Sequence, residues 1–176
     1  MGAFLDNEEI WLRAVEPEDA EIMWKVENDS DQWIQNGMSA PFSRKNIMDY
    51  ALTYNADPFQ AGQIRLIASL KRDNTFVGIA DLYEISAIHR HAFVGIYILP
   101  EFRSKGFGSQ VLGLIEDYAF RLLNLRNLGA RIMSGNEFSI TMFSHKDYIL
   151  RGTVPGWLIY DDKEYEMLFY SKCKIR

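Results

Sequence analysis

The hydrophobic residues of the chain recur with two periods that alternate from the N-terminus to the C-terminus. An apolar residue at about every second position is typical of strands, and a repeat of three or four positions is typical of helices. Strands are expected at residues 10–14, 63–70, 76–85, 91–99, 127–134, 157–160 and 164–172. Helices are expected from 17 to about 28, from 44 to about 55, from 107 to 123, and from 136 to about 146. Gly152, Pro155 and Gly156 are expected to interrupt the chain before the final hairpin.

This order of elements predicts an α/β chain of the α+β type with a mixed, mostly antiparallel sheet. The turns at residues 71–74 and 161–163 are short enough to form hairpins, and hairpins pair strands antiparallel. A parallel crossover is required only between strand 91–99, helix 107–123 and the strand that follows it. If those two strands splay apart, the gap between them is a natural ligand cleft. Because no internal repeat or linker-like segment is visible, we expect a single domain over residues 1–176.

The stretch from Phe93 to Leu123 joins a mostly apolar run, a proline, a basic turn with two glycines, and a long helical repeat. The first N–H groups of a helix have no partner inside it, so they can bind an anion at the helix N-terminus. Glycines let the backbone approach such a ligand closely. The stretch therefore predicts a phosphate-binding turn, and a pyrophosphate is our working interpretation.

Composition limits the classes of protein that remain. The chain has 176 residues, of which 48% are hydrophobic, so it can bury a sizeable core. Its net charge of −5 argues against a general nucleic-acid binder and suits a cationic ligand, although enzymes of neutral substrates are equally acidic. The single cysteine, Cys173, excludes an internal disulfide and a cysteine-based zinc site. Neither a targeting segment nor a membrane span is visible, and we expect a cytoplasmic protein with no membrane partner.

Two motifs resemble those of a known family. The run IYILPEFRSKGFG resembles motif A of the GCN5-related N-acetyltransferases (GNAT), with matches at Arg103, Gly106 and Gly108. The downstream run NEFSITMFSHKDYI resembles a second family motif, with matches at Asn136 and Ser139 and at the following Ile140. The terminal hairpin is similar to that of members acting on polyamines or on ribosomal-protein N-termini. The resemblance implies the GNAT fold, with about seven strands, about four helices and splayed central parallel strands.

The same resemblance implies acetyl-CoA as the cofactor. Backbone groups of the central strand would pair with the pantetheine arm, and those of the turn would hold the pyrophosphate, with one further asparagine near the thioester. The residues implied are Ile96, Tyr97 and Ile98 on the strand, Arg103, Ser104, Lys105, Gly106, Phe107 and Gly108 in the turn, and Asn136. The two glycines also suit simple turn geometry, and the two basic residues also suit a solvated surface pair.

The catalytic residues are less clearly marked. Many relatives carry a proton-donating tyrosine where this chain has Phe143, which has no hydroxyl to donate to the leaving thiolate. Glu84, late on its strand, is the candidate base or amine-binding group; its alternative is a solvated carboxylate at a strand end. His89 and His91 titrate in a useful range but suit polar surface equally well.

The loop of residues 28–43 covers the acceptor cleft in relatives. It holds Asp29, Asp31 and Trp33, an acidic and aromatic group that suits a cationic amine and equally suits a solvated loop. The fuller acidic set of the polyamine enzymes is not clearly reproduced, which weakens the case for a polyamine.

We therefore expect an acetyl-CoA-dependent N-acetyltransferase that acts on a primary amine by direct attack in a ternary complex. The acceptor would be a protein N-terminus or a small-molecule amine such as a polyamine. A coenzyme A-binding module with little or no transferase activity is the alternative, because of Phe143, and a generic nucleotide- or phosphate-binding domain is the third interpretation. The apolar and aromatic residues of hairpin 157–172 offer a surface for a homodimer.

Overall fold

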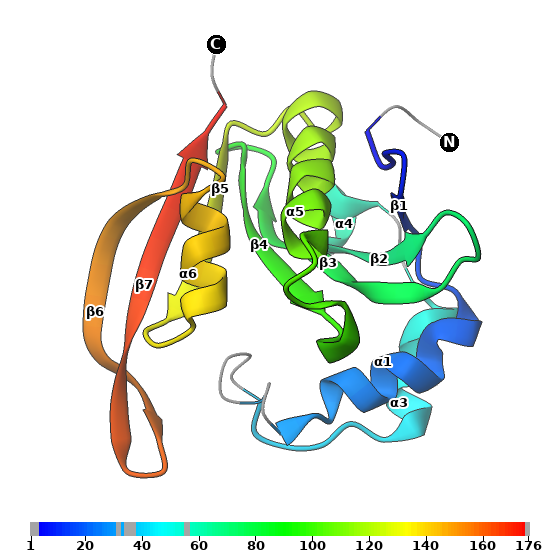
Figure 1. Ribbon diagram of the computed structural model, residues 1–176, viewed down its shortest axis with the longest axis horizontal. Helices are drawn as coiled ribbons and strands as arrows, with labels where there is room; N and C mark the ends of the chain where they lie inside the picture. Colours follow the sequence, from blue (N-terminus) through cyan, green and yellow to red (C-terminus); the bar gives the residue numbers. More distant parts are fainter. Residues whose placement is uncertain (1–3, 31–32, 34–37, 55–56, 175–176) are drawn as a thin grey trace.

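The computed structural model describes residues 4–30, 33, 38–54 and 57–174, and its seven strands form one sheet (Figure 1). The strands are β1 (Ile10–Arg13), β2 (Ile64–Leu70), β3 (Phe76–Ser86), β4 (His91–Ile98), β5 (Asn127–Met133), β6 (Ile149–Tyr160) and β7 (Lys163–Cys173). Their order across the sheet is β1-β2-β3-β4-β5-β7-β6, and every adjacent pair is antiparallel except β4 and β5. The fold class predicted from the sequence is confirmed.

Helices cover both faces of the sheet. They are α1 (Ala20–Glu27), α3 (Arg44–Leu52), α4 (Pro58–Ala61), α5 (Phe107–Asp117) and α6 (Glu137–Ser144), and a π-helical turn, η3 (Tyr118–Leu122), continues α5. Successive side chains of a strand point to opposite faces, so β2 feeds two separate hydrophobic clusters. Leu66 and its alternate neighbours pack with α5, whereas Ile67 packs with α1 and α3. Among the described residues, no helix is long and apolar enough to cross a bilayer.

The short helix α4 was not expected from the sequence. It begins after Asp57, whose side chain accepts hydrogen bonds from the backbone N–H groups of Phe59 and Gln60 at 3.0 and 3.1 Å. Pro58 occupies its first position, where a proline costs no hydrogen bond. The aspartate and the proline together are a helix-start signal that the hydrophobic period, over only four residues, could not reveal.

The predicted interruption at Gly152, Pro155 and Gly156 is wrong. β6 runs continuously from Ile149 to Tyr160 beside β7. The glycines and the proline coincide with two irregularities in the pairing register and do not end the strand. The long partner strand supplies the pairing that the local sequence does not favour. Five large hydrophobic residues of β6 are exposed: Ile149, Leu150, Trp157, Ile159 and Tyr160. The homodimer through this hairpin stays a prediction.

The central parallel pair is splayed, as the sequence predicts. Only three residue pairs join β4 to β5, and the last of them is Phe93 with Gly129. A Cβ atom on Gly129 would lie 2.7 Å from the ring of Phe93, so the glycine makes room for that ring. Tyr83 stacks on the other side of Phe93 at a centroid distance of 5.7 Å, and the Arg131 guanidinium lies 3.9 Å from the ring centre. This stack fills the point at which the two strands separate.

Candidate functional site

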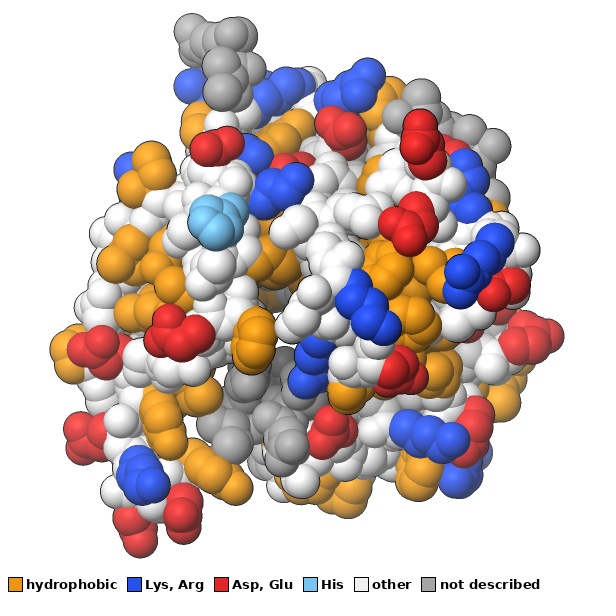
Figure 2. All heavy atoms as spheres, viewed as in Figure 1, with side chains coloured by type: hydrophobic (Ala, Val, Ile, Leu, Met, Phe, Trp, Pro, Cys, Tyr) orange, Lys and Arg blue, Asp and Glu red, His pale blue; other side chains and the backbone are white. Residues whose placement is uncertain are grey.

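A cavity of about 870 Å³ opens where β4 and β5 separate. Its walls come from the strands on either side of this separation, from α1, α3 and α6, and from the β6–β7 hairpin. Figure 2 shows the surface hollowed between the β6–β7 half and the β4–α5 half, with hydrophobic side chains on both sides. Most lining residues are apolar or aromatic. The charged ones among the described residues are Glu27, Arg65, Asp81 and Arg131.

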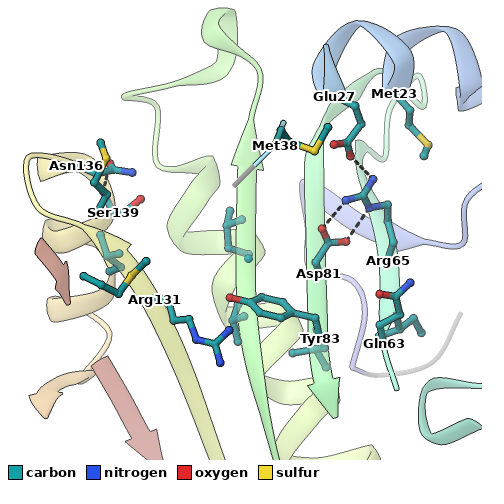
Figure 3. Close-up of a pocket in the computed structure, with 18 of the residues that line it drawn as sticks. Met23, Glu27, Met38, Gln63, Arg65, Asp81, Tyr83, Arg131, Asn136 and Ser139 are labelled. Atoms are coloured by element: carbon teal, nitrogen blue, oxygen red, sulfur yellow. Dashed lines mark hydrogen bonds and ion pairs between the residues drawn. The ribbon is translucent and has the colours of Figure 1, made fainter. Parts of the chain in front are cut away.

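Three of these charged side chains form one cluster at the end of the cavity that α1 and β2 enclose (Figure 3). Arg65 and Asp81 are opposite each other on β2 and β3, so they share a face of the sheet. The guanidinium donates to both oxygens of Asp81, at 2.9 Å from Nε and 2.8 Å from the terminal nitrogen. Its other terminal nitrogen donates to Glu27, the last residue of α1. Although burial opposes its charge, the two carboxylates raise the pKa of Arg65.

The cluster is held by its surroundings. The Tyr54 hydroxyl accepts from the backbone N–H of Arg65 at 2.9 Å and donates to its carbonyl at 2.5 Å, taking the place of a missing neighbour strand. The indole N–H of Trp33 donates to the carbonyl of Glu27 at 3.0 Å and fixes the end of α1. The Asn28 side chain donates to the carbonyl of Phe42 at 3.1 Å and accepts from its N–H at 2.9 Å, which ties the end of α1 to the residues before α3.

Glu84 is the predicted catalytic residue that the structure does not bring to the cavity. It does not line the cavity, and its backbone, with φ of 50°, lies where the register of β3 and β4 shifts. Both of its carboxylate oxygens accept from Arg131 at 2.6 Å, and this hydrogen bonding lowers the pKa of Glu84. Because the Glu84 carboxylate does not line the cavity, its predicted role as a base has no geometric support.

The other polar residues that the sequence suggested for catalysis or amine binding do not line the cavity either. His89 and His91 lie at the β3–β4 turn, with their rings stacked 6.1 Å apart. Asp29 follows α1 without lining the cavity, and Asp31 lies outside the described residues. Of that loop group, Trp33 acts through its hydrogen bond to α1.

Phe143 does line the cavity, from the last turn of α6. Its ring is buried and packs edge-on against Tyr148 at 4.8 Å between centroids. Tyr148 stands behind it and does not line the cavity. Asn136 and Ser139 line the cavity from the other end of this helix, and the Asn136 side chain accepts from the N–H of Ser139 at 3.1 Å to begin α6.

Tyr83 is the lining hydroxyl that sequence inspection passed over. Figure 3 shows its ring directed across the cavity floor toward Arg131. Burial raises the pKa of Tyr83, so the phenol keeps its proton at neutral pH. The Tyr83 hydroxyl can therefore donate a hydrogen bond, whereas the Phe143 side chain has no donor.

The backbone of β4 presents its free edge to the splay. The N–H of Leu99 donates to the carbonyl of Val77 at 3.0 Å, so odd-numbered residues of this strand face β3. By strand alternation, the main-chain groups of Ile96 and Ile98 face the other way, into the gap. Ile98 uses its carbonyl to accept from Arg103 at 2.9 Å. Of the three β4 residues that the family resemblance implies, Ile96 therefore has the main-chain groups that are most available to a ligand. The main-chain groups of Tyr97 pair with β3 instead.

The predicted pyrophosphate turn lies at the start of α5 and does not line the cavity. Gly106 begins the helix with φ of 82°, and Ser104 also has a positive φ, 58°. Phe107 is buried edge-on against Phe102 at 5.7 Å, which anchors the helix start. Lys105 is exposed, although its Nζ donates to the carbonyl of Glu101 at 2.8 Å.

Gly108 serves the packing of α5 as well as the turn. A Cβ atom there would lie 2.9 Å from the sulfur of Met142 on α6. The first turn of α5 therefore sits directly against α6, and its unpaired N–H groups open at the outer end of the splay. An anionic group of a ligand lying in the gap would suit this helix start.

Comparison with known proteins decides the family. The family model described as the acetyltransferase (GNAT) domain matches residues 9–145. This chain belongs to the GNAT family. The membership confirms the N-acetyltransferase class, and with it the coenzyme A chemistry, that the sequence motifs predicted.

Several curated relatives and one solved structure agree with the assignment. A putative ribosomal N-acetyltransferase of Bacillus subtilis is 26% identical, covering 96% of this chain and 93% of that protein. A spermidine N(1)-acetyltransferase of Vibrio cholerae is 26% identical, covering 83% of this chain and 82% of that protein. The crystal structure of spermidine N-acetyltransferase from Vibrio cholerae with CoA and spermine superimposes with a TM-score of 0.83 at 21% identity, covering 95% and 96% of the two chains. At that identity the likeness shows the fold.

Proposed function

We propose that this protein transfers the acetyl group of acetyl-CoA to a primary amine by direct attack in a ternary complex. The amine nitrogen forms the new bond to the acetyl carbon, the carbon–sulfur bond breaks, and coenzyme A leaves as the thiol. An ammonium acceptor also releases one proton to a base or to water. Acetyl-CoA supplies the activated acetyl group. The protein binds and orients the two substrates and takes a proton from the amine.

The observation that carries the proposal is the splay between β4 and β5, with the cavity at one end and the start of α5 at the other. The free edge of Ile96 offers one donor and one acceptor to an extended arm, as an added strand would use them. The N–H groups that open α5 suit a pyrophosphate, and Arg103 and Lys105 add positive charge beside them. The residues present therefore fit coenzyme A.

The acceptor end supplies carboxylates to an amine. Asp81 and Glu27 are the acidic residues among the described lining residues, and Asp81 lies beside Gly95 on the central strand. They attract an ammonium group and are the groups able to take its proton, directly or through water. Tyr83 and Ser139 line the cavity with hydroxyls that can donate to the departing sulfur in place of the family tyrosine. The relative named for spermidine supports a small-molecule amine as the acceptor, and the one named as a putative ribosomal N-acetyltransferase supports a protein amine.

The test is release of coenzyme A thiol from acetyl-CoA by the purified protein with a panel of primary amines, with mass spectrometry of the product. Transfer to at least one amine, with a product heavier by one acetyl group, is expected. One observation, the absence of a hydroxyl at Phe143, favours a coenzyme A-binding module instead. If acetyl-CoA raises the melting temperature while no amine releases thiol, the transferase proposal fails and the binding module remains.

A further inference from the structure

The end of the cavity that holds Glu27, Arg65 and Asp81 is here called the acceptor end. Its net charge limits the number of positive charges that a bound acceptor can carry. The Glu27, Arg65 and Asp81 side chains form one bonded group with two negative charges and one positive charge. The remaining charged lining residue, Arg131, is neutralised by Glu84 from outside the cavity. Among the described lining residues, the acceptor end therefore has a formal charge of −1, which one ammonium group balances.

Arg65 occupies the place that a second cation would need. Its guanidinium already bonds both carboxylates, and a bidentate arginine–carboxylate pair is strong and geometrically fixed. Only 22% of its side chain is exposed, and Tyr54 holds its backbone on both sides. A second ammonium at this cluster would meet a fixed positive charge in a partly desolvated site, where like charges repel strongly.

The rest of the acceptor wall is mostly apolar, and its described polar members Asn46 and Gln63 carry no charge. The apolar and aromatic residues that α1, α3 and the loop between them contribute to the cavity wall are Met23, Met38, Phe42, Ile47 and Tyr50. Such a wall suits a hydrocarbon or aromatic body next to one ammonium, and among its described residues it offers no further carboxylate to a polyamine chain.

We propose that Arg65 is a specificity-determining residue, a built-in cation that makes this enzyme select acceptors with one positive charge over diamines and polyamines. The inference rests on the proposed function and specifies the substrate class of the same site. On this inference the acceptor class of the chain differs from the one for which its spermidine relatives are named.

The experiment compares hexylamine with 1,6-diaminohexane, which share a carbon chain and differ by one ammonium. We expect wild-type kcat/KM to favour hexylamine by at least about tenfold, because the second charge is repelled. In Arg65→Met, two carboxylates lose their internal partner, and the preference should shift toward the diamine by at least about tenfold. A wild-type preference for the diamine, or a smaller shift in the variant, overturns the proposal.

The control is Arg13→Met. Arg13 also holds a carboxylate with two hydrogen bonds, to Asp19 at 2.7 Å each, and its side chain is 13% exposed, but it does not line the cavity. This variant breaks an equivalent ion pair elsewhere, so its hexylamine-to-diamine ratio should equal that of the wild type. An equal change of the ratio in both variants would assign the effect to lost stability and overturn the proposal.

Two further measurements keep the inference open to refutation. The diamine should raise the melting temperature of Arg65→Met more than that of the wild type, a result that requires no turnover and so separates this inference from the proposed function. If Arg65→Met does not fold, Glu27→Gln replaces it, because this variant keeps the Arg65–Asp81 pair and brings the cluster to neutrality. Its KM for hexylamine should then rise by at least about tenfold; an unchanged KM overturns the proposal.

Discussion

The two acidic positions of β3 should differ sharply in their effect on turnover. Glu84 does not line the cavity; it forms an ion pair with Arg131, and the side chains of Glu84 and Arg131 are 54% and 33% exposed. Exposed pairs contribute about 0.2–1 kcal/mol. Even if all of that appeared in catalysis, Glu84→Gln would lower kcat by at most about fivefold, while the unpaired charge of Arg131 would raise KM for an ammonium acceptor.

Asp81→Asn should be far more damaging, because Asp81 lines the cavity and is proposed to take the proton of the amine. Loss of a general base costs about 10²–10⁴-fold. The assay is kcat and KM for one amine, by thiol release, from pH 6 to pH 9, with circular dichroism to verify that both variants fold. The reasoning is refuted if Glu84→Gln loses more than about 100-fold in kcat while Asp81→Asn stays within about fivefold in kcat.

The pH dependence of stability provides a second test of the variant Glu84→Gln. Because Arg131 lowers the pKa of Glu84 below 4.5, the folded state binds its proton less readily than the unfolded state. The stabilisation is therefore present above the unfolded pKa and is lost as pH falls through the folded pKa. Glu84→Gln should thus melt below the wild type at pH 7 and together with it at strongly acidic pH.

Three further changes probe the splay and its two ends. Gly108→Glu should abolish acetyl-CoA binding, measured by calorimetry, and should also lower the melting temperature because its Cβ meets Met142; undiminished affinity would contradict a pyrophosphate at this turn. Phe143→Tyr should leave acetyl-CoA affinity unchanged and raise kcat, whereas a fall in kcat would show that a different group protonates the sulfur. Gly129→Ala should destabilise the fold by about 1–3 kcal/mol in urea melts, because it displaces Phe93 from the junction; an unaltered midpoint would contradict that packing.

The extent to which the sequence predicted the site depends on how local each feature is. The phosphate turn, Asn136 and Phe143 lie in contiguous motifs, and the structure places Asn136 and Phe143 on the cavity wall. The polar residues Asp81 and Tyr83 alternate with apolar ones on β3, a pattern that marks one exposed face of a strand. This pattern could have identified both of them before the structure was known.

The charged cluster could not be predicted in the same way. Its members come from α1, β2 and β3, and they meet only because the register sets Arg65 opposite Asp81 and the end of α1 lies above both. Glu84 looked equally suitable as a strand residue. Its positive φ and the register shift beside it, which no local pattern indicates, direct its carboxylate to Arg131 instead.

The short parallel contact between β4 and β5 also has a mechanical consequence. Strands β1–β4 form one unit and β5–β7 another, and within the sheet only three residue pairs connect them. Outside the sheet, the connection depends on contacts such as the 3.0 Å ion pair of Lys172 on β7 with Glu116 on α5. A ligand arm lying along the free edge of β4 would act as a brace between the two units. Amide hydrogen exchange in β5 and β7 should therefore slow when acetyl-CoA binds, even though these strands hold little of the predicted cofactor contact.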